Sequence, residues 1–361
     1  MGMGMTEKQG GSDVRTNTTR AVPHGSGPWG EEFLLTGHKW LFSAPMCDGH
    51  LVLAKTDEHG SSCFFVPRWR PDGSKNPIHI QRLKSKVGNR SNSSSEVEFK
   101  EAWGVLVGAE GRGIRTIIEM ANYTRLDCAL SSAGYIRQGL AQALHYTRNR
   151  FVFGRYLVDQ PAMTTLLADM ALEAEAATVL AMDLAAHFGS TAPQDVAWRR
   201  LMTPAAKFWN CKRAVGFCGE AMEVFGGNVY VEDGAIGRLF REAPVNSIWE
   251  GSGNVMCLDV LRAIAKDPAS AQALLDDLLR MAHDDRALRQ ELRALQALLQ
   301  TDPAQLEALG RVLAQRLAVA VLFPAYQRSV TTLAGKPFAD FAVAETRRWA
   351  EVVKAGNVKP D

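Results

Sequence analysis

The chain has 361 residues, 46% of them hydrophobic and 22% charged, which argues against a disordered or a membrane-embedded protein. Lys and Arg number 41 against 39 Asp and Glu, so the net charge of +2 indicates no particular nucleic-acid or acidic partner. Six scattered cysteines have no zinc-type spacing, and the chain has neither a secretory segment nor an apolar run of ~18 residues. These features predict buried thiols, no metal, no membrane and a cytoplasmic location.

The first hundred residues predict β-structure. Short runs alternate between apolar and polar residues, as expected for half-buried strands. Turn-rich pieces at 24–30, 57–62, 71–76 and 88–95 separate them. The predicted strands are Glu32–Leu35, Leu51–Ala54, Cys63–Val66 and Glu96–Phe99.

The remainder predicts helices. Apolar residues recur at helical spacing from Ile114 to about Ala186, and Pro161 fits the first turn of a helix. A long helix is predicted over Val196–Phe225, ended by two glycines. The predicted remainder is an irregular connection at 227–238, a loop from Arg241 that becomes helical after Gly253, and two amphipathic helices over 268–322 broken at Asp302–Pro303.

The strands precede the helices instead of alternating with them, which makes a doubly wound parallel sheet improbable and predicts an α+β protein. We divide the chain into a β-rich domain at 1–107, a helical domain at 108–264 and a helical extension at 265–361.

Two segments near the start could hold a flat ligand. Thr6, two adjacent glycines and Ser12-Asp13 suit a loop whose N–H and hydroxyl groups approach a polar planar molecule, although a plain turn has the same composition. The Trp40-Leu41-Phe42 run could form a stacking wall for an aromatic cofactor or belong to the core.

Two later segments could contact anions. Arg150, followed by Phe153-Gly154 and Gln160, could bind a phosphate or cap a helix end. The run Asn246–Asn254 places Glu250 among apolar and small residues before a helix, where glycines and hydroxyls form a donor-rich nest. A lone Glu there also serves as a helix N-terminal partner.

In their order and spacing these segments resemble the acyl-CoA dehydrogenase family over Met3–Ile264. The matching segments are Thr6–Asp13 (T-E-x-x-x-G-S-D in the family), Lys86–Ser91 (K-x-G-x-R), Gly108–Gly113 (G-x-E-G-x-G), Arg150–Gly154, Met222–Gly227 and Trp249–Ser252. The residues in and around Thr6–Asp13, Lys86–Ser91 and Trp249–Ser252 resemble in particular those of the AidB-like branch of the family. That branch is tied to the alkylation-damage response.

The resemblance implies an antiparallel, β-barrel-like middle domain followed by an all-α helical bundle, with FAD as cofactor. Thr6 would hydrogen-bond the polar edge of the isoalloxazine, and Trp40–Phe42 would form the wall against it. Arg150 and Phe153 would meet the FAD of a neighbouring subunit, which implies a homo-oligomer, expected to be a tetramer. The residues implied to contact FAD are Met5, Thr6, Gly11, Ser12, Trp40, Leu41, Phe42, Arg150, Phe153, Gln160, Gly227, Ile248, Trp249, Gly251, Ser252 and Asn254.

Two positions depart from the family pattern. Gln160 lies one residue closer to Phe153-Gly154 than is usual, and Glu223 replaces the usual Gln before the paired glycines.

Glu250 resembles the family's catalytic base, and Arg125 resembles an arginine that restrains it. A carboxylate in a water-poor pocket becomes basic enough to remove the α-proton of an acyl thioester, while flavin takes the β-hydrogen as hydride. The thioester carbonyl must meanwhile accept hydrogen bonds. The implied substrate is a short or branched acyl-CoA, and the implied electron acceptor is an electron-transfer flavoprotein. Two structural alternatives remain open. Arg125 could form a salt bridge on a helix surface, and Glu250 could interact with the N-terminus of the following helix.

The family normally begins with a helical domain that this chain does not show, so we expect a fragment or a misplaced start. Without that wall the chain by itself is expected to dehydrogenate poorly or not at all.

In AidB-like proteins the C-terminal helices are linked to duplex DNA. From Ala265 onward there are 13 Lys and Arg against 12 Asp and Glu, and the tail diverges from the family after about Phe323. The arginines of this region could form an ordinary solvated helix face or a stripe that binds phosphates, and both interpretations remain open. The alternative functions are therefore a DNA-binding protective protein with residual dehydrogenase activity, or a relic that binds flavin loosely. The candidate stripe is Arg280, Arg286, Arg289 and Arg293, diluted by Asp284, Asp285 and Glu291.

Overall fold

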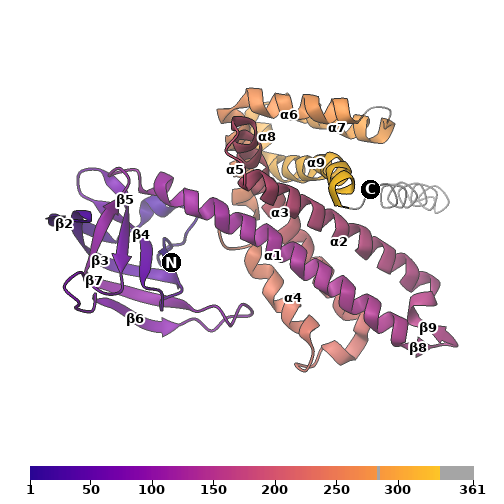
Figure 1. Ribbon diagram of the computed structural model, residues 1–361, viewed down its shortest axis with the longest axis horizontal. Helices are drawn as coiled ribbons and strands as arrows, with labels where there is room; N and C mark the ends of the chain where they lie inside the picture. The colour runs from indigo at the N-terminus through magenta and orange to yellow at the C-terminus, as the bar shows by residue number, and fades with distance from the viewer. Residues whose placement is uncertain (283–284, 334–361) are drawn as a thin grey trace. The chain divides into compact units, whose positions relative to one another are not determined.

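The computed structural model describes residues 1–282 and 285–333, and it divides into two compact units (Figure 1). The first unit comprises Met1–Arg125 and Trp249–Gly251, and the second comprises Leu126–Ile248 and the residues from Ser252 on. Helix α1 (Gly113–Asn149) runs from one unit into the other. None of the helices in the described part of the chain is both long and apolar enough to cross a membrane.

The first unit is built on one seven-stranded sheet. The hydrogen-bonded order is β1-β4-β2-β3-β7-β5, with β6 beside β7. A short 3-10 helix at Val14–Thr16 joins the first two strands. The strands are β1 (Gly2–Gly4), β2 (Arg20–Gly27), β3 (Gly30–Ser43), β4 (Gly49–Thr56), β5 (Gly60–Pro67), β6 (Ile78–Leu83) and β7 (Ser94–Val107).

The pairing is antiparallel except at β4, which lies parallel to β1 and, at one residue pair, to β2. A wholly antiparallel sheet, as expected from the resemblance, is therefore not what forms. Strand β4 also pairs with β5, so the strand pairings β4-β2-β3-β7-β5 lead back to β4. The barrel-like closure itself stays a prediction.

Alternation along the strands fills one face of the sheet with apolar side chains. Phe33 and Leu35 of β3 are buried, and the ladder between β3 and β7 shifts register between Lys39 and Phe42. This irregularity lets two side chains three residues apart both point inward. The core residues of the sheet are Ala21, Phe33, Leu35, Phe42, Val52, Ala54, Phe64, Val66, Val97, Phe99 and Ala102.

The second unit is helical apart from a two-stranded hairpin, and Figure 1 shows its long helices α2 and α3 side by side. Short 3-10 helices lie at Leu157–Asp159 and Gly226–Val229. Besides the end of α1, the elements are β8 (Phe151–Val152), β9 (Arg155–Tyr156), α2 (Pro161–Phe188), α3 (Pro193–Phe225), α4 (Ala235–Asn246), α5 (Gly253–Lys266), α6 (Pro268–Met281), α7 (Arg286–Leu299), α8 (Pro303–Ala308) and α9 (Gly310–Leu333).

Local sequence explains where these helices begin and end. Pro161 occupies the first turn of α2, as predicted, since a missing N–H costs nothing there. Helix α3 ends at Gly226, whose φ of 65° favours glycine. Asp267 and Asp285 cap α6 and α7 by accepting hydrogen bonds from backbone N–H groups three residues on.

The helical extension shares its core with the helices before it. Buried Met202 of α3, Val260 of α5 and Leu275 of α6 belong to the same apolar cluster, together with Leu317 of α9. The described extension therefore packs as part of the second unit. The domain boundaries that we drew at 107 and 264 stay predictions, and the tail at 334–361 lies outside the described residues.

The structure supports the mixed α+β organisation and corrects several elements. Residues 235–246 form helix α4, where an irregular connection up to Arg238 and a loop from Arg241 were predicted, although Gly237 and Pro244 lower the local helix propensity. Ile236, Leu239 and Ala243 form its buried stripe, which outweighs the weak local propensity. The region predicted as two helices contains four, and strands β1, β2 and β6 were not predicted.

Candidate functional site

The opening loop and the middle of β3 lie against each other in the first unit. The Trp40 backbone N–H donates a hydrogen bond to the Thr6 carbonyl oxygen at 2.8 Å. Met5 and Thr6 are half-buried, whereas Gly11 and Ser12 are exposed. The two segments that the sequence assigned to one ligand are thus joined by their backbones, and hydroxyl and N–H groups remain accessible beside them.

Gly11 allows this loop to fold tightly. A Cβ at that position would lie 2.5 Å from the Thr6 hydroxyl oxygen, closer than atoms of real side chains approach. The absence of a side chain leaves the Thr6 hydroxyl at a small opening. This donor set fits the polar edge of a flat ring such as isoalloxazine.

The Trp40 ring carries a cation on one face. Lys84 Nζ lies 3.2 Å from the ring centroid and also forms an ion pair with Glu96 Oε1 at 2.7 Å. Trp40 and Glu96, together with Lys8 and His38, line a hollow of about 400 Å³ on the surface of the sheet. An aromatic wall beside a hollow can accept a planar ligand by stacking.

The neighbours of Trp40 differ in their placement. The Leu41 side chain is 50% exposed and can face a ligand. The Phe42 side chain is fully buried, with its ring centroid 4.5 Å from that of His50 and 5.9 Å from that of Phe99. The Phe42 side chain therefore belongs to the core, because the register irregularity of β3 turns it inward, and the expected contact of Phe42 with the flavin stays a prediction.

A buried ion pair lies directly behind the loop, and sequence reasoning missed it. Lys39 Nζ is 2.8 Å from Glu7 Oε1, and both side chains are wholly inaccessible to solvent. Burial by itself would raise the pKa of Glu7, but Lys39 and the hydroxyl and amide donors of Thr18 and Thr19 lower that pKa to about 2. Burial lowers the pKa of Lys39 to about 8 despite its partner. The signal lay in the sequence: a Glu and a Lys each adjoin a residue predicted to contact the ligand.

Glu250 and Arg125 also belong to the first unit, and they are in direct contact. Arg125 Nε donates a hydrogen bond to the Glu250 carbonyl oxygen at 3.0 Å, and Arg125 Nη1 reaches Asn122 Oδ1 at 3.4 Å. Arg125 is only 6% exposed, which contradicts the reading of a surface salt bridge.

The backbone of Glu250 is strained. Its φ is +56°, a region costing a residue with a Cβ about 1–3 kcal/mol, and Gly251 follows with a φ of 99°. Such a conformation persists only where the surroundings hold it, and the Arg125 hydrogen bond does so here. Helix α5 starts with Ser252 as its N-cap, two residues after Glu250. The strained turn and this hydrogen bond therefore fix the backbone of Glu250 before the helix begins.

The residues expected to meet FAD from a neighbouring subunit lie on the hairpin of the second unit. Arg150 follows the end of α1, and Phe153 at the hairpin turn is 95% exposed with a φ of 49°. Gln160 Nε2 donates a hydrogen bond to the Val152 carbonyl at 3.0 Å, so it supports the hairpin. An exposed Phe on a rigid turn is a suitable contact for another molecule.

The other predicted residues of the second unit lie at helix ends. Gly227 belongs to the 3-10 turn after α3, and Ile248 follows α4 and is exposed. At the start of α5, Arg311 Nη1 contacts Asn254 Oδ1 at 3.4 Å. A cation beside a helix N-terminus suits an anion.

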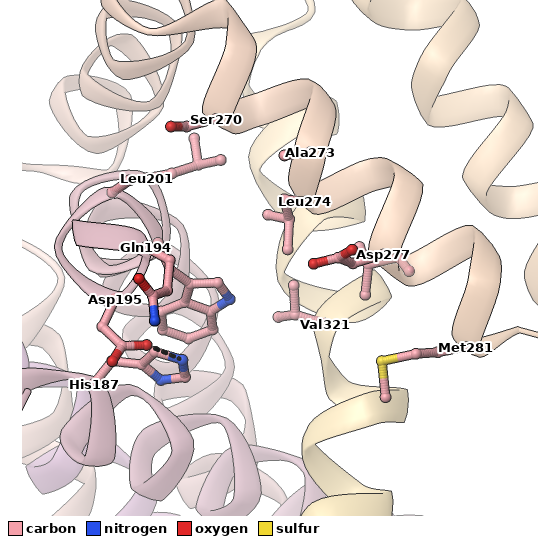
Figure 2. A pocket seen from close by; sticks show the side chains of 13 residues that line it. His187, Gln194, Asp195, Leu201, Ser270, Ala273, Leu274, Asp277, Met281 and Val321 are labelled. Atoms are coloured by element: carbon pink, nitrogen blue, oxygen red, sulfur yellow. Dashed lines mark ion pairs between the residues drawn. The ribbon is translucent and has the colours of Figure 1, made fainter. Parts of the chain in front are cut away.

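The second unit has a separate pocket of about 270 Å³ between α3, α6 and α9 (Figure 2). The His187 ring stacks on Trp198 at 3.8 Å between centroids, and His187 Nε2 lies 3.6 Å from Asp195 Oδ1. Asp277, on the opposite wall in Figure 2, pairs with Arg280. These polar groups satisfy one another, and none of the residues predicted from the sequence lines the pocket.

Metal and thiol chemistry find little support in the part of the chain that the structure describes. No group of three or more His, Cys, Asp or Glu side chains there could hold a metal ion. Five of the six cysteines are buried, as predicted, and Cys47 is partly buried. Burial raises the pKa of Cys63 to about 11 and that of Cys218 to about 12, which leaves these thiols unreactive.

Comparison with known proteins agrees with this arrangement. The acyl-CoA dehydrogenase middle domain matches residues 2–102, and the C-terminal domain of the same family matches residues 111–265. The chain belongs to the acyl-CoA dehydrogenase family. The putative acyl-CoA dehydrogenase AidB of Escherichia coli K12 is 50% identical over 318 residues, which cover 88% of this chain and 57% of that protein. Within the family, the chain therefore falls with the AidB-like branch.

Two further matches, one in sequence and one in structure, come from Caenorhabditis elegans. Acyl-CoA dehydrogenase family member 11 is 34% identical, over 73% of this chain and 45% of its own length. The crystal structure of ACDH-11 in complex with C11-CoA superimposes with a TM-score of 0.84 at 30% identity, covering 95% of this chain and 63% of that one. The chain thus spans about half the length of these curated acyl-CoA dehydrogenase relatives.

Proposed function

We propose that this chain carries the flavin-binding and proton-abstracting parts of an FAD-dependent acyl-CoA dehydrogenase. The observation that carries the proposal is the strained Glu250 turn, whose carbonyl oxygen is fixed by the buried Arg125 at 3.0 Å. Strain that surrounding contacts maintain is typical of functional residues. A Glu whose backbone is held in place, in a chain of this family, fits the base that removes the α-proton of an acyl thioester.

The chain's own residues have distinct parts in this proposal. Thr6 and the loop up to Ser12 offer hydroxyl and N–H donors to the polar edge of the cofactor, and Trp40 and Leu41 offer the flanking wall. Bound FAD would supply the acceptor for the β-hydrogen, which the substrate loses as hydride. Glu250 takes the α-proton, and Arg125 acts on it through the backbone hydrogen bond.

The substrate class that we propose is an acyl-CoA thioester. The C. elegans relative was crystallised in complex with C11-CoA, and other relatives are dehydrogenases of cyclohexane-1-carbonyl-CoA. Acyl-chain preference, including the short or branched chain expected from the sequence, stays a prediction. An electron-transfer flavoprotein as acceptor is proposed on family grounds.

A homo-oligomer is part of the same proposal. The exposed Phe153 turn and the exposed Arg150 beside it have the character of a contact surface, and the resemblance assigns them to the FAD of a second subunit. Light scattering on Phe153→Ser with and without FAD tests this, with the wild-type chain expected to form a tetramer. An unchanged association state in the variant would contradict it.

The experiment for the main proposal compares two Glu-to-Gln variants. FAD is first titrated into the purified chain, and binding is followed by quenching of flavin fluorescence. An acyl-CoA series is then added anaerobically, and bleaching of the bound flavin is recorded. Slow bleaching suffices, because the comparison is between variants.

We expect Glu250→Gln to bind FAD normally and to bleach about 10²–10⁴-fold more slowly, the usual contribution of a general base. The matched control is Glu220→Gln, an exposed position on α3, which should behave as wild type. Equal bleaching by Glu250→Gln and wild type would remove Glu250 from the mechanism. Failure of the wild-type chain to bind FAD would remove the flavoprotein proposal itself.

One observation favours a second function, binding to the phosphates of duplex DNA. Arg286, Arg289 and Arg293 are exposed on α7 at spacings that share one helix face. Among the described residues no carboxylate pairs with them, and Glu291 reaches Arg316 instead at 4.0 Å. Arg280, which we had grouped with them, lies on α6 because Asp285 starts a new helix, and it pairs with Asp277.

Salt dependence tests the phosphate stripe. Each phosphate contact contributes about −0.9 to the slope of log affinity against log salt, so Arg289→Gln should make that slope less negative by about 1. Arg262→Gln, an exposed arginine on α5, is the matched control and should leave the slope unchanged. Identical slopes for the two variants would reject the stripe.

A further inference from the structure

The Glu7–Lys39 pair differs from the ion pairs on the surface of the sheet. Its two side chains are fully buried, with Lys39 Nζ 2.8 Å from Glu7 Oε1. By contrast, Arg20 and Asp57 form an ion pair in the same unit with side chains 65% and 71% exposed. Burying two charges is costly unless further hydrogen bonds satisfy them.

The Glu7 carboxylate meets that condition. Oε1 accepts hydrogen bonds from the Thr19 hydroxyl at 2.6 Å and the Thr19 N–H at 3.1 Å, besides that from Lys39. Oε2 accepts from the Thr18 N–H at 2.6 Å and the Thr18 hydroxyl at 2.9 Å. A single carboxylate therefore ties together the opening loop, the segment before β2 and the middle of β3.

Glu7 and Lys39 each adjoin a residue that we expect to contact the flavin. Glu7 directly follows Thr6, Lys39 directly precedes Trp40, and the Trp40 N–H donates to the Thr6 carbonyl at 2.8 Å. Side chains alternate along a strand, so Lys39 turns inward and Trp40 turns outward. The opening loop and the middle of β3 are therefore joined in the protein interior by the ion pair. The same two segments carry Thr6 and Trp40 on the outer side.

Stability by itself does not account for such a pair. Replacing a buried ion pair with apolar residues of similar volume is often neutral or stabilising, whereas charged groups with several fixed hydrogen bonds restrict geometry. We propose that Glu7 and Lys39 are positioning residues that hold the Thr6 loop and the Trp40 strand in the one arrangement that accepts the flavin. The inference rests on the proposed FAD function, and it extends that function to two residues that do not touch the cofactor.

Three variants of the full chain test the proposal. Glu7→Gln/Lys39→Met removes both charges at nearly constant volume and leaves no unpaired ion inside. Thr19→Val is milder, because it removes one hydroxyl donor and keeps the ion pair. Asp57→Asn is the matched control, since it removes a carboxylate from the exposed pair of the same unit.

Two readouts are needed for each variant. Hydrogen exchange of the protein without FAD reports how firmly residues 5–13 are held, with helix α2 as internal reference. Fluorescence titration gives the FAD dissociation constant, and the visible spectrum of bound flavin reports its surroundings. Circular dichroism and a thermal melt establish that each variant is folded.

We expect the double variant to fold, to exchange faster by about tenfold over residues 5–13 only, and to bind FAD on the order of tenfold more weakly with an altered flavin spectrum. Thr19→Val should change both readouts in the same direction by a smaller factor. Asp57→Asn should change neither.

Other results would overturn the inference. If the folded double variant keeps wild-type exchange over residues 5–13 and wild-type FAD affinity, the pair does not position the platform. If Thr19→Val and the double variant only lower the melting temperature, the pair serves stability alone. A wild-type chain that binds no FAD would defeat the proposed function, and hydrogen exchange would still decide whether the pair holds the loop.

Discussion

The sheet unit and the helical unit bury their polar groups in different ways. In the sheet unit a charged carboxylate and a charged ammonium are enclosed together, Glu7 with Lys39. In the helical unit, where Lys207 of α3 is also buried, one enclosed bridge between helices is neutral: the Asn246 side-chain amide donates to the Ser132 hydroxyl at 3.2 Å, and that hydroxyl contacts Cys211 Sγ at 3.3 Å.

The difference follows from how each backbone satisfies its own hydrogen bonds. A helix pairs its N–H and C=O groups internally, so its interior needs only an occasional bridge. A loop packed under a strand leaves N–H groups without ladder partners, and those of Thr18 and Thr19 both require an acceptor. One carboxylate can accept several such bonds, which explains a buried charge at that place.

The largest expected effect on stability comes from removing Lys39 while the Glu7 carboxylate stays buried. Lys39→Met should lower the free energy of unfolding by about 3–5 kcal/mol, because the Glu7 carboxylate would stay buried without its counter-charge. Urea denaturation followed by circular dichroism measures this. Asp57→Asn should cause no measurable change, since its ion pair is exposed to solvent. Similar losses in the two variants would mean that burial does not set the cost.

Acid should affect the sheet unit through Glu7. Although burial opposes ionisation, Lys39 and the threonine donors lower the pKa of Glu7 from 4.5 to about 2. A depressed folded-state pKa stabilises the protein above pH 4.5, and this stabilisation is lost as the pH falls from 4.5 to 2. The loss amounts to about 3 kcal/mol. Hydrogen exchange against pH should show the sheet opening over this window, and Glu7→Gln should abolish that dependence.

Breaking a neutral bridge in the helical unit should cost less. The Asn210 side-chain NH₂ donates to the carbonyls of Ala129 at 3.2 Å and Ala177 at 3.1 Å, and so joins α3 to α1 and α2. Asn210→Leu should destabilise by about 1–2 kcal/mol, because two hydrogen bonds are lost but no charge is stranded. Removing Asn210 Oδ1, which is buried and has no hydrogen-bond partner in the described part of the chain, offsets part of the loss.

Thr178→Val is the control for this bridge, since the Thr178 hydroxyl donates a hydrogen bond within its own helix, to the Ala174 carbonyl. It should stay within about 0.5 kcal/mol of wild type in the same urea experiment. A larger effect for Thr178→Val than for Asn210→Leu would show that contacts between helices are not the limiting ones.

The comparison of the two units also explains what the sequence could predict. Signals that depend on neighbouring residues were reliable: Pro161 at a helix start and the glycines after Phe225 at a helix end both agree with the structure. Helix α4 was missed because Gly237 and Pro244 outweighed, in local terms, a buried stripe that only tertiary packing reveals. The order of short motifs predicted the family, since matches in sequence order carry more information than any one of them.

Contacts between distant segments were beyond local reasoning. Nothing near Phe42 decided between a cofactor wall and the core, where the irregular ladder with β7 places its ring. The contact of Arg125 with Glu250, 125 residues away, was expected from the family resemblance and not from neighbouring residues. Glu7 and Lys39 were present in the motifs, but their pairing needs the loop to fold back under β3. Residue types at the site were thus predictable, whereas the buried pair behind the opening loop was not.

The smallest expected effect compares one substitution, Gly to Ala, in the two units. Gly134 lies inside α1 with nothing within 4 Å of an added Cβ, so Gly134→Ala should stabilise by about 0.5–1 kcal/mol through lower backbone entropy of the unfolded chain. At Gly11 the same methyl group would lie 2.5 Å from the Thr6 hydroxyl oxygen, so Gly11→Ala should destabilise by less than about 1 kcal/mol as Thr6 rotates away. Thermal melts of the two variants should therefore shift in opposite directions. A stabilising Gly11→Ala would mean that the loop has room for a Cβ, and that the close approach to Thr6 does not shape the opening beside its hydroxyl.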